Sequence, residues 1–380
     1  MKKNLAPVFF SLAVLLAGCA TGRTENPSTL KAAFQNNFPI GVAVNQRQFT
    51  GVDTNGVALV QAQFNAIAPE NVLKWEIVHP QPGTNGYDFE PSDAYVAFGE
   101  KNKMLIVGHT LAWHSQTPRW VFQDAAGRAL SGTKAADREL LLQRLHDHIQ
   151  TVVGRYRGRI QIWDVVNEAL NDSRSLEDTN ILRRNSPWVQ ILGEEFIVKA
   201  FEYAHAADPA AILRYNDYSL ENPAKLKRLL ALIKSLQAQH VPVMAIGSQT
   251  HATLSVPSLE QEDNFLTVVR SLGLPIHITE LDVTGSQRGQ QIQSADVNEN
   301  NQGVNGDALV AAANEKLAKQ YGDLFKMFLK HRDEIKLVTF WGVTDADSWR
   351  SSGSPLLFDG HWQPKPAFEA VLKTAQPDSL

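Results

Sequence analysis

Short apolar runs alternate with longer amphipathic stretches along most of the chain. The apolar runs predict eight β-strands, at residues 40–44, 66–69, 104–111, 160–167, 212–216, 244–249, 276–281 and 337–342. Positions with helical spacing lie between several of these strands, at residues 93–102, 137–154, 194–206, 224–239, 258–271 and 309–331. Strands that alternate with helices of this length usually pair in parallel through right-handed crossovers.

Eight strand–helix units predict a closed barrel, the (β/α)8 or TIM barrel of the α/β class, in a single domain. The alternative is an open, doubly wound sheet, which more often begins with a glycine-rich turn that binds phosphate. The chain contains no G-x-G-x-x-G motif, so the sequence favours the barrel. We detect no second domain and no short-period repeat.

Residues 286–307 interrupt this alternation. The segment is rich in Gln, Asn, Gly and Ser, has few apolar residues, and is too long for an ordinary strand-to-helix connection. It is either a surface insertion or a loop that borders a substrate cleft, because it follows the C-terminal end of a predicted strand.

The first residues of the chain indicate a targeting segment rather than a part of the fold. Lys2 and Lys3 precede an apolar run at residues 6–16, which is too short to span a bilayer as a permanent helix. The run ends in Leu16-Ala17-Gly18-Cys19, which resembles the bacterial lipoprotein signal that is cleaved before a lipidated cysteine. The alternative is a plain secretory signal with an incidental cysteine.

The lipoprotein interpretation divides the chain into three parts: a signal peptide at residues 1–18, a lipidated tether at 19–28 and the barrel domain at 29–376. A lipid on Cys19 would hold the protein at a membrane, since each buried CH₂ contributes about 0.8 kcal/mol of affinity. Ala20 follows Cys19, and by resemblance to Gram-negative lipoproteins a non-acidic residue there indicates the outer membrane, with the domain facing the periplasm or the exterior. Cys19 is the only cysteine, so the chain forms no intramolecular disulfide.

Composition narrows the class of partner. Of the 380 residues, 43% are hydrophobic and 20% are charged, as in an ordinary soluble globular protein. The net charge of −4 argues against a nucleic-acid-binding protein, which is usually basic. The chain has no block of like charges that would indicate a polybasic membrane patch. We expect a monomer and no nucleic-acid partner.

Polar and aromatic side chains collect at the ends of seven of the eight predicted strands. In chain order they are Glu70, Asn71, Lys74 and Trp75; His109, Trp113, His114 and Gln116; Asn167 and Glu168; Asn216, Asp217 and Tyr218; Gln249, Thr250 and His251; Glu280 and Asp282; and Trp341, Asp345, Asp347, Trp349 and Arg350. Each of them alone has an ordinary structural explanation, as a helix cap, a solvated ion or a core aromatic. In a barrel, however, the carboxyl ends of the strands form one face, which is where active sites lie.

Two glutamates in this set fit the cleavage of a glycosidic bond. Glu168 and Glu280 end the fourth and seventh predicted strands, on facing sides of the barrel mouth. The reaction needs one carboxylic acid to protonate the leaving oxygen and one carboxylate to stabilise or attack the anomeric carbon, and a separation of about 5–5.5 Å between them gives a retaining enzyme. Trp113, Trp341 and Trp349 offer flat faces on which sugars stack, and amide side chains bind sugar hydroxyls.

Metal-dependent chemistry and a serine hydrolase are the alternatives. His109, His114 and His251 with nearby carboxylates could hold zinc, but the spacing of the first two lacks the H-E-x-x-H form. No G-x-S-x-G elbow is present for a nucleophilic serine. We therefore expect neither a metal nor a cofactor.

Seven segments of the chain resemble glycoside hydrolase family ten, the endo-β-1,4-xylanases. They are Phe38–Val44, Ala68–Glu76, Gly108–Pro118, Trp163–Ala169, Gly247–His251, Ile278–Asp282 and Thr339–Gly342, and they follow the family's order from about residue 30 to residue 370. The resemblance implies that Glu168 is the acid/base and Glu280 the nucleophile. It also implies that His251 hydrogen-bonds the nucleophile and that Asp282 orients His251.

The resemblance assigns further residues to the sugars on either side of the cleaved bond. Asn167 and Gln249 would bind near the 2-hydroxyl next to that bond; Glu70, Asn71, Lys74 and Gln116 would hold sugars on the non-reducing side; His109, Trp113, Trp341 and Trp349 would form the walls around the cleaved sugar; and Tyr218 would lie on the leaving-group side. Ser219 departs from the Asn that the family often has after Asn-Asp-Tyr, which leaves the leaving-group contacts open. The insertion at 286–307 is also atypical of the shorter enzymes.

The implied substrates are xylan and xylo-oligosaccharides. A barrel glycosidase that cleaves cellulose or mixed-linkage glucan is one alternative, and a surface glycan-binding lipoprotein on an inactive barrel is another. The implied mechanism requires an ionised Glu280, which we expect His251 and Asn167 to favour as hydrogen-bond donors. It also requires a protonated Glu168, and we expect the negative charge of Glu280 to help raise its pKa.

Overall fold

The computed structural model describes residues 28–285 and 307–376. The predicted signal peptide, Cys19, and nearly all of the tether and of the polar insertion lie outside these residues. Within the two described ranges, no helix is long and apolar enough to cross a bilayer.

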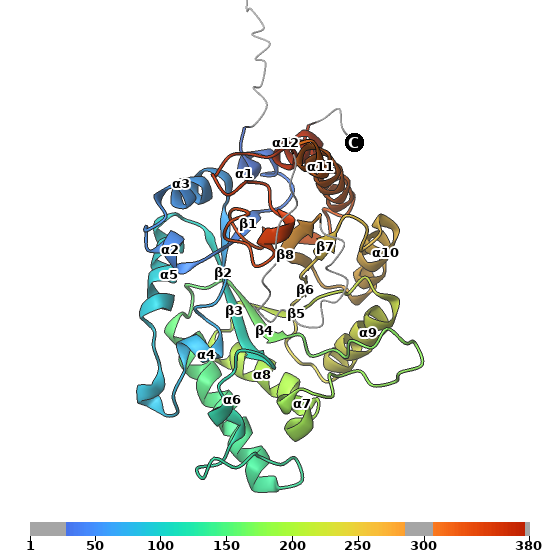
Figure 1. Cartoon of the computed structure of the whole chain (residues 1–380). Coiled ribbons are helices and arrows are strands. Elements are labelled where there is room, and N and C mark those ends of the chain that lie inside the picture. Colours follow the sequence, from blue (N-terminus) through green and yellow to red (C-terminus); the bar gives the residue numbers. More distant parts are fainter. Residues whose placement is uncertain (1–27, 286–306, 377–380) are drawn as a thin grey trace, which may run out of the picture.

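Eight parallel strands form a closed ring (Figure 1). They are β1 (Ile40–Val44), β2 (Ala66–Pro69), β3 (Leu105–Trp113), β4 (Ile162–Asn167), β5 (Ile212–Asp217), β6 (Ala245–Ser248), β8 (Ile276–Thr284) and β9 (Ile335–Phe340). Neighbours pair in chain order from β1 to β6, β9 pairs with both β8 and β1, and the pairing of β6 with β8 closes the ring. The predicted single-domain (β/α)8 barrel is confirmed.

Two strands extend beyond their predicted carboxyl ends. β3 runs on to Trp113 and β8 to Thr284, beyond the predicted ends at residues 111 and 281. The short strand β7 (His251–Thr253), which was not predicted, pairs with this outer part of β8. In β8 the apolar run ends before Asp282, whereas the backbone pairing continues through Asp282 to Thr284.

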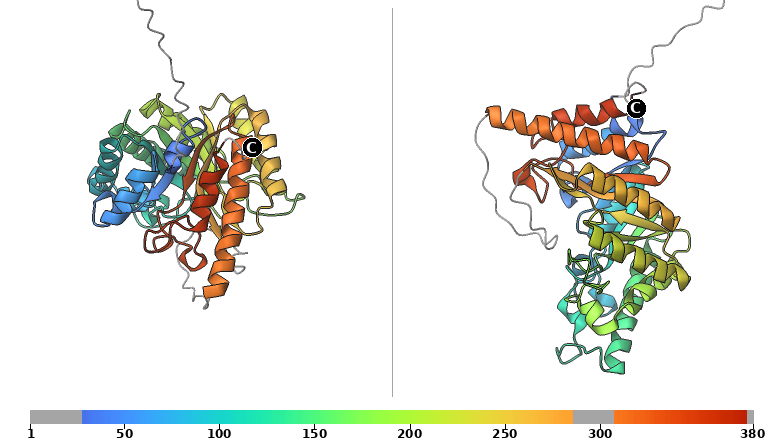
Figure 2. Two further views of the ribbon diagram at one scale, coloured as in Figure 1. Left: turned by 90° about the horizontal axis from the view of Figure 1, so that it is seen from above. Right: turned by 90° about the vertical axis from the view of Figure 1, so that its right-hand side faces the viewer.

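Helices surround the ring and separate it from solvent (Figures 1 and 2). They are α1 (Leu30–Ala33), α2 (Gln46–Phe49), α3 (Thr54–Gln63), α4 (Trp75–Val78), α5 (Glu90–Lys101), α6 (Ala135–Arg155), α7 (Pro187–Leu192), α8 (Glu195–Ala207), α9 (Pro223–Ala238), α10 (Leu259–Val269), α11 (Asp307–Lys330) and α12 (Pro366–Thr374), with short 3₁₀ turns at Thr84–Gly86, Arg119–Phe122, Arg270–Leu272 and Ser351–Gly353. The six predicted helices are present, and α11 and α12 lie side by side (Figure 2).

Local sequence signals fix the start of the helix that later bears on the site. Asn222 precedes α9, and its side-chain oxygen accepts hydrogen bonds from the backbone N–H groups of Ala224 and Lys225. Pro223 occupies the first turn, where its missing N–H costs nothing. These residues set the direction in which α9 leaves the end of β5.

The apolar core lies mainly between the strands and the helices, where Trp163, Phe201 and Phe265 are among the largest fully buried side chains. A smaller apolar cluster includes Ala66, Val107 and Leu337. Large side chains thus fill the outer layer and hold the strands in register, while the carboxyl ends of the strands carry the polar groups described below.

Candidate active site

Glu168 and Glu280 line one pocket at the carboxyl ends of the strands. The residues around the pocket are Glu70, Asn71, Lys74, His109, Trp113, Asn167, Glu168, His251, Glu280, Trp341, Asp347, Ser348 and Trp349. Only 1% of Glu168 and 3% of Glu280 is exposed, so both carboxyl groups depend on protein hydrogen bonds. The fold therefore places the two predicted catalytic residues at one site. The separation of about 5–5.5 Å between their carboxyl groups remains a prediction.

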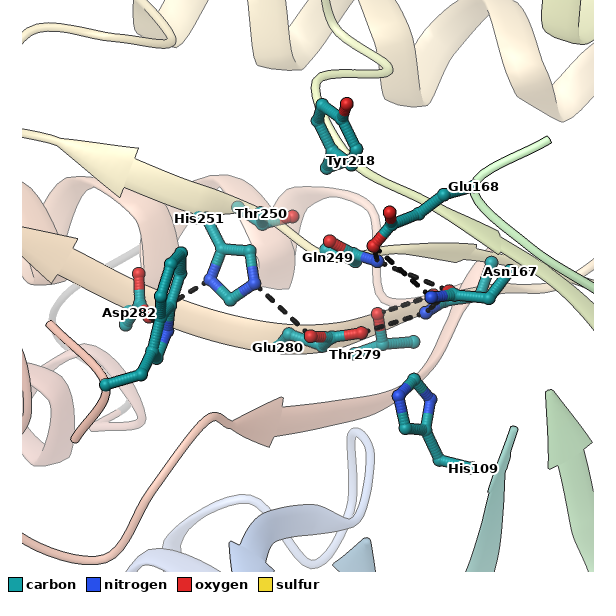
Figure 3. Close-up of polar contacts among 12 residues, drawn as sticks. His109, Asn167, Glu168, Tyr218, Gln249, Thr250, His251, Thr279, Glu280 and Asp282 are labelled. Carbon is teal, nitrogen blue, oxygen red and sulfur yellow. Dashed lines mark hydrogen bonds and ion pairs between the residues drawn. The ribbon is translucent and has the colours of Figure 1, made fainter. Parts of the chain in front are cut away.

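The backbone turns sharply at Glu168, directly after β4. Glu168 has φ 57°, in the left-handed region that residues with a side chain rarely adopt, and its N–H donates to the carbonyl of Asn216 on β5 at 2.9 Å. Backbone conformations of this kind persist where the surroundings hold them, and they concentrate at functional sites. The turn aims the Glu168 carboxyl at the pocket rather than along the strand (Figure 3).

Glu280 lies within β8 and accepts hydrogen bonds from two neighbours (Figure 3). His251 Nε2 lies 3.2 Å from Oε2, and Asn216 Nδ2 donates to Oε1 at 2.9 Å. Thr279 Oγ1 donates to Asn216 Oδ1 at 2.7 Å, which fixes the orientation of that amide. Donors on both oxygens suit a carboxylate, which accepts hydrogen bonds and donates none.

The predicted donor Asn167 is therefore corrected to Asn216. The amide nitrogen of Asn167 donates to Glu168 Oε1 at 3.2 Å, not to Glu280. Its oxygen accepts a hydrogen bond from Asn216 at 2.9 Å, so the two amides link the two glutamates. The residues sit at paired positions on β4 and β5, and strand register, which the sequence does not reveal, decides which of them reaches β8.

His251 connects Glu280 to Asp282, as the resemblance implied. Its Nδ1 lies 3.0 Å from Asp282 Oδ2, while Nε2 faces Glu280. Burial acts to lower the pKa of His251, but the charge and hydrogen bond of Asp282, and then those of Glu280, raise it to about 9. The imidazole thus carries both protons near neutral pH and donates to a carboxylate on each side.

Asp282 is held as a carboxylate by further cations and donors. Trp349 Nε1 donates to Oδ2 at 2.9 Å, and the Arg350 guanidinium pairs with Oδ1. Burial acts to raise the pKa of Asp282, but the positive charges of His251 and Arg350 outweigh it, and the pKa is lowered. Trp349, predicted as a wall of the sugar site, therefore also fixes this carboxylate.

Glu168 has donors as well, yet its pKa moves upward. Gln249 Nε2 donates to Oε1 at 3.0 Å and Trp113 Nε1 to Oε2 at 2.9 Å, and both contacts act to lower the pKa. Burial and, second, the negative charge of Asp217 outweigh them and raise it. The direction agrees with the sequence-based expectation, while the leading causes are burial and Asp217 rather than Glu280.

The part of the pocket that was predicted to hold sugars on the non-reducing side is lined by Glu70, Asn71, Lys74 and Asp347. Lys74 Nζ donates to Asn71 Oδ1 at 3.0 Å and to Gln116 Oε1 at 2.7 Å. Gln116 therefore holds Lys74 in place, and Lys74 lines the pocket. Burial and the charge of Asp347 raise the pKa of Glu70 to about 7, against the opposing effect of Lys74. Asp347, which was not assigned a role in the sequence analysis, also lines the pocket here.

His109, which lines the pocket, contacts a buried ion pair. Its Nδ1 lies 3.0 Å from Asp164 Oδ2, and Asp164 also pairs with both Nε and NH2 of Arg214. Burial acts to raise the pKa of Asp164, but the charge of Arg214 and then His109 lower it to about 2. Burial and Arg214 lower the pKa of His277 to about 3, so that histidine stays neutral.

Sequence reasoning did not assign Asp164 or Arg214, although polar residues at alternate positions of an otherwise apolar strand are a usable signal of an inward-facing site. Two of the three histidines considered for zinc contact carboxylates instead: His109 contacts Asp164, and His251 contacts Glu280 and Asp282. In the described part of the chain, no group of three or more His, Cys, Asp or Glu side chains has a metal-binding arrangement.

Three of the predicted sugar contacts, Gln116, Tyr218 and Gln249, lie off the pocket lining. Gln249 is buried behind Glu168, to which it donates. Tyr218 lies beyond Glu168 (Figure 3), is only 4% exposed, and donates through its hydroxyl to Asp172 Oδ2 at 2.6 Å. Arg183 NH2 donates to the same hydroxyl at 2.9 Å, so the ring is fixed beside the acid/base candidate with little free surface.

Comparison with known proteins places these features in a family. The model of glycosyl hydrolase family 10 matches residues 29–374. An endo-1,4-β-xylanase B of Paenibacillus barcinonensis is 38% identical over 356 residues, which cover 92% of this chain and 98% of that protein.

Two solved structures have the same fold over most of the chain. An endoxylanase retrieved from a sugarcane soil metagenome has a TM-score of 0.80 at 40% identity and covers 92% of this chain and 100% of that one. A xylanase of Thermoanaerobacterium saccharolyticum, solved as a mutant with xylotriose, has a TM-score of 0.78 at 35% identity and covers 92% and 99%. The family model spans nearly all of the described barrel and both glutamates, and the chain belongs to glycosyl hydrolase family 10.

Proposed function

We propose that the protein is a retaining endo-1,4-β-xylanase that cleaves xylan and xylo-oligosaccharides, with Glu280 as nucleophile and Glu168 as acid/base. The observation that carries this proposal is the unequal setting of two buried carboxyls in one pocket. Donors meet both oxygens of Glu280, whereas burial and Asp217 raise the pKa of Glu168, which is the direction that a proton donor needs. The similar proteins are xylanases, and one was solved with xylotriose, which supports xylan as the substrate.

The reaction follows as two displacements. A carboxylate oxygen of Glu280 bonds to the anomeric carbon while the glycosidic C–O bond breaks and the leaving oxygen takes the proton of Glu168. A covalent glycosyl-enzyme results, and Glu168 is now a carboxylate. It then removes a proton from water, whose oxygen attacks the anomeric carbon and releases Glu280. The anomeric configuration of the product is that of the substrate.

The neighbours of Glu280 act on its charge during both steps. The His251 imidazolium and the Asn216 amide donate to the carboxylate at rest and to the returning carboxylate after deglycosylation. Asn167 and Gln249 lie against the acid/base, close to where the 2-hydroxyl of the cleaved sugar would bind. Lys74, Asn71 and Glu70 would hold the preceding sugar.

We further propose that the protein is exported and anchored through a lipid on Cys19, as a monomer at the bacterial outer membrane. The motif Leu16-Ala17-Gly18-Cys19 supports the lipid anchor. The barrel is compatible with it, since α1 leads into the amino end of β1 whereas the pocket lies at the carboxyl ends of the strands. A tether attached before α1 would leave the pocket free for a polymer.

Replacement of the two glutamates should separate their roles. Glu280→Ala should abolish activity on every substrate. Glu168→Ala should lower kcat/KM on xylan by about 10²–10⁴-fold, because the leaving sugar needs a proton, and should largely spare an activated aryl xylobioside. Steady-state kinetics on both substrates measure this, with the exposed Glu139→Ala as control. Equal losses on xylan and the aryl glycoside in Glu168→Ala would remove its role as the acid.

The pH dependence should respond to Asp217. Asp217→Asn removes a negative charge that raises the pKa of Glu168, so that pKa should fall. Since the protonated acid is the active form, the alkaline limb of the kcat/KM profile on xylan should move to lower pH. Asp333→Asn, which removes an equal charge at an exposed position before β9, should leave the limb in place. A limb that stays or moves upward in Asp217→Asn would exclude this electrostatic coupling.

The lipid anchor has a direct test. In a Gram-negative host supplied with an alkynyl fatty acid, the wild-type protein should be labelled and sediment with outer membranes. Cys19→Ser should be unlabelled and soluble, with unchanged kcat/KM on xylan. A wild-type protein without label, released by cleavage at another position, would establish a plain secretory signal instead.

A further inference from the structure

The chain between β4 and α7 forms a compact loop directly after the acid/base. This β4–α7 loop, residues 171–182, closes at its base through an antiparallel bridge between Leu170 and Leu182. Asn171 N–H donates to the Ile181 carbonyl at 2.9 Å, and Arg183 N–H donates to the Ala169 carbonyl at 2.8 Å. The loop thus projects from the barrel beside α9, and its bridge residue Leu170 lies two positions beyond Glu168 (Figure 1).

One arginine from outside the loop meets its backbone at five points. Arg228, on α9, is 4% exposed. Its guanidinium donates to the carbonyls of Asn171 (3.3 Å), Ser173 (2.5 Å), Ser175 (3.0 Å), Asp178 (3.1 Å) and Asn180 (3.0 Å). Arginine carries five N–H donors in a planar fork, and the loop occupies all three nitrogens.

The guanidinium has a purely organising role at this place. Within residues 28–285 and 307–376, no carboxylate forms a salt bridge with Arg228; the carbonyl dipoles of the loop meet its charge. A segment of this length without helix or strand would otherwise sample many conformations, and fixing each residue costs about 1–2 kcal/mol of backbone entropy. Arg228 gives five carbonyls of the loop a hydrogen-bond donor and so favours one conformation of the loop.

The start of the loop is also coupled to the acid/base. Asp172 accepts hydrogen bonds from the Tyr218 hydroxyl (2.6 Å) and Lys225 Nζ (2.8 Å), and pairs with Arg183 NH1 (2.7 Å). Arg183 Nε in turn donates to the Glu168 carbonyl at 3.0 Å. Arg183 therefore links Asp172 of the loop to the backbone of Glu168.

The β4–α7 loop follows Glu168 in the chain, and Arg183 at its end contacts the Glu168 carbonyl. In the proposed mechanism Glu168 protonates the leaving oxygen, so the segment that follows Glu168 is the candidate to contact the departing chain. Tyr218 is nearly covered and offers little surface there, whereas residues 174–177 of the loop are exposed and include Leu176, which is 54% exposed.

We propose that Arg228 is a positioning residue for the leaving-group side of the cleft: by fixing five carbonyls of the β4–α7 loop, it holds a rigid wall against which the sugars of the departing chain bind. This inference rests on the proposed xylanase activity and adds a determinant of substrate length to it. A loop held in its binding conformation loses less entropy when the oligosaccharide binds, so affinity for long substrates depends on Arg228.

The test compares substrates with and without sugars on that side. In Arg228→Met, kcat/KM for xylohexaose should fall about tenfold or more, mainly through KM, because the wall is no longer preorganised. An aryl β-xylobioside, whose leaving group is a phenol, should keep kcat/KM within about twofold of the wild type. Arg228→Lys has three donors on one nitrogen, so its kcat/KM for xylohexaose should lie between those of the wild type and Arg228→Met. Lys227→Met, an exposed neighbour on α9, is the matched control.

A second variant loosens the loop from within and leaves α9 intact. Asp178 accepts hydrogen bonds from Asn171 Nδ2 (2.9 Å) and from the Asn180 N–H (3.0 Å), so Asp178→Ala removes contacts inside the loop alone. It should reproduce the split between xylohexaose and the aryl xylobioside. In both variants trypsin should cleave the folded protein after the exposed Arg174 about tenfold faster than the wild type.

The outcomes distinguish this inference from the proposed function. A wild type inactive on both substrates would remove the xylanase proposal. An active wild type whose variants lose both substrates in parallel would make Arg228 a purely structural residue. Variants with faster tryptic cleavage and an unchanged KM for xylohexaose would show that the loop binds no leaving-group sugar, and either result overturns the inference.

Discussion

The pairing of β6 with β8 closes the ring of strands, and the geometry of the site depends on that closure. It places Gly247 opposite His277, and Glu280 N–H donates to the Gln249 carbonyl at 3.1 Å just beyond the paired segment. A Cβ on Gly247 would lie 2.3 Å from Asn216 Oδ1, so glycine leaves the space in which that amide reaches Glu280. Without this closure, Gln249 and His251 would not meet the two glutamates.

Closure alone does not distinguish the two carboxyls; their neighbours do. Glu280 faces an imidazolium that Asp282 keeps protonated, and an amide that Thr279 orients. Glu168 faces amide and indole donors, but the negative charge of Asp217 acts on it, and its burial is nearly complete. Two identical side chains at one pocket thus acquire opposite tasks from the charges around them, which is the general way in which carboxyl pairs divide acid and nucleophile.

Much of this arrangement was predictable from the sequence, because the carboxyl ends of parallel strands form one face and the motif residues sit at those ends. The bounds of β1 and β2 matched, and the pocket gathers Glu70, Lys74 and His109 with both glutamates. Hydrogen-bond partners were less predictable. Whether Asn167 or Asn216 reaches Glu280 depends on strand register and amide orientation. The hydrophobic periodicity of the sequence reveals neither of these.

Residues that act from a distance were harder still to predict. Arg228 lies on an ordinary amphipathic helix, and its role becomes visible only when α9 is placed beside the β4–α7 loop. Arg214 and Asp164 lie within strands and face inward. Their burial is explained by the bidentate ion pair that they form, which only the structure shows.

The division of labour between the glutamates is tested most directly by trapping the covalent intermediate. A 2-deoxy-2-fluoro xylobioside with a good leaving group slows the second displacement, so the glycosyl-enzyme should accumulate and inactivate the protein with one equivalent of label. Peptide mapping by mass spectrometry should place the fluoroxylobiosyl group on Glu280. Label on Glu168, or turnover without any covalent adduct and with inverted product, would contradict the account.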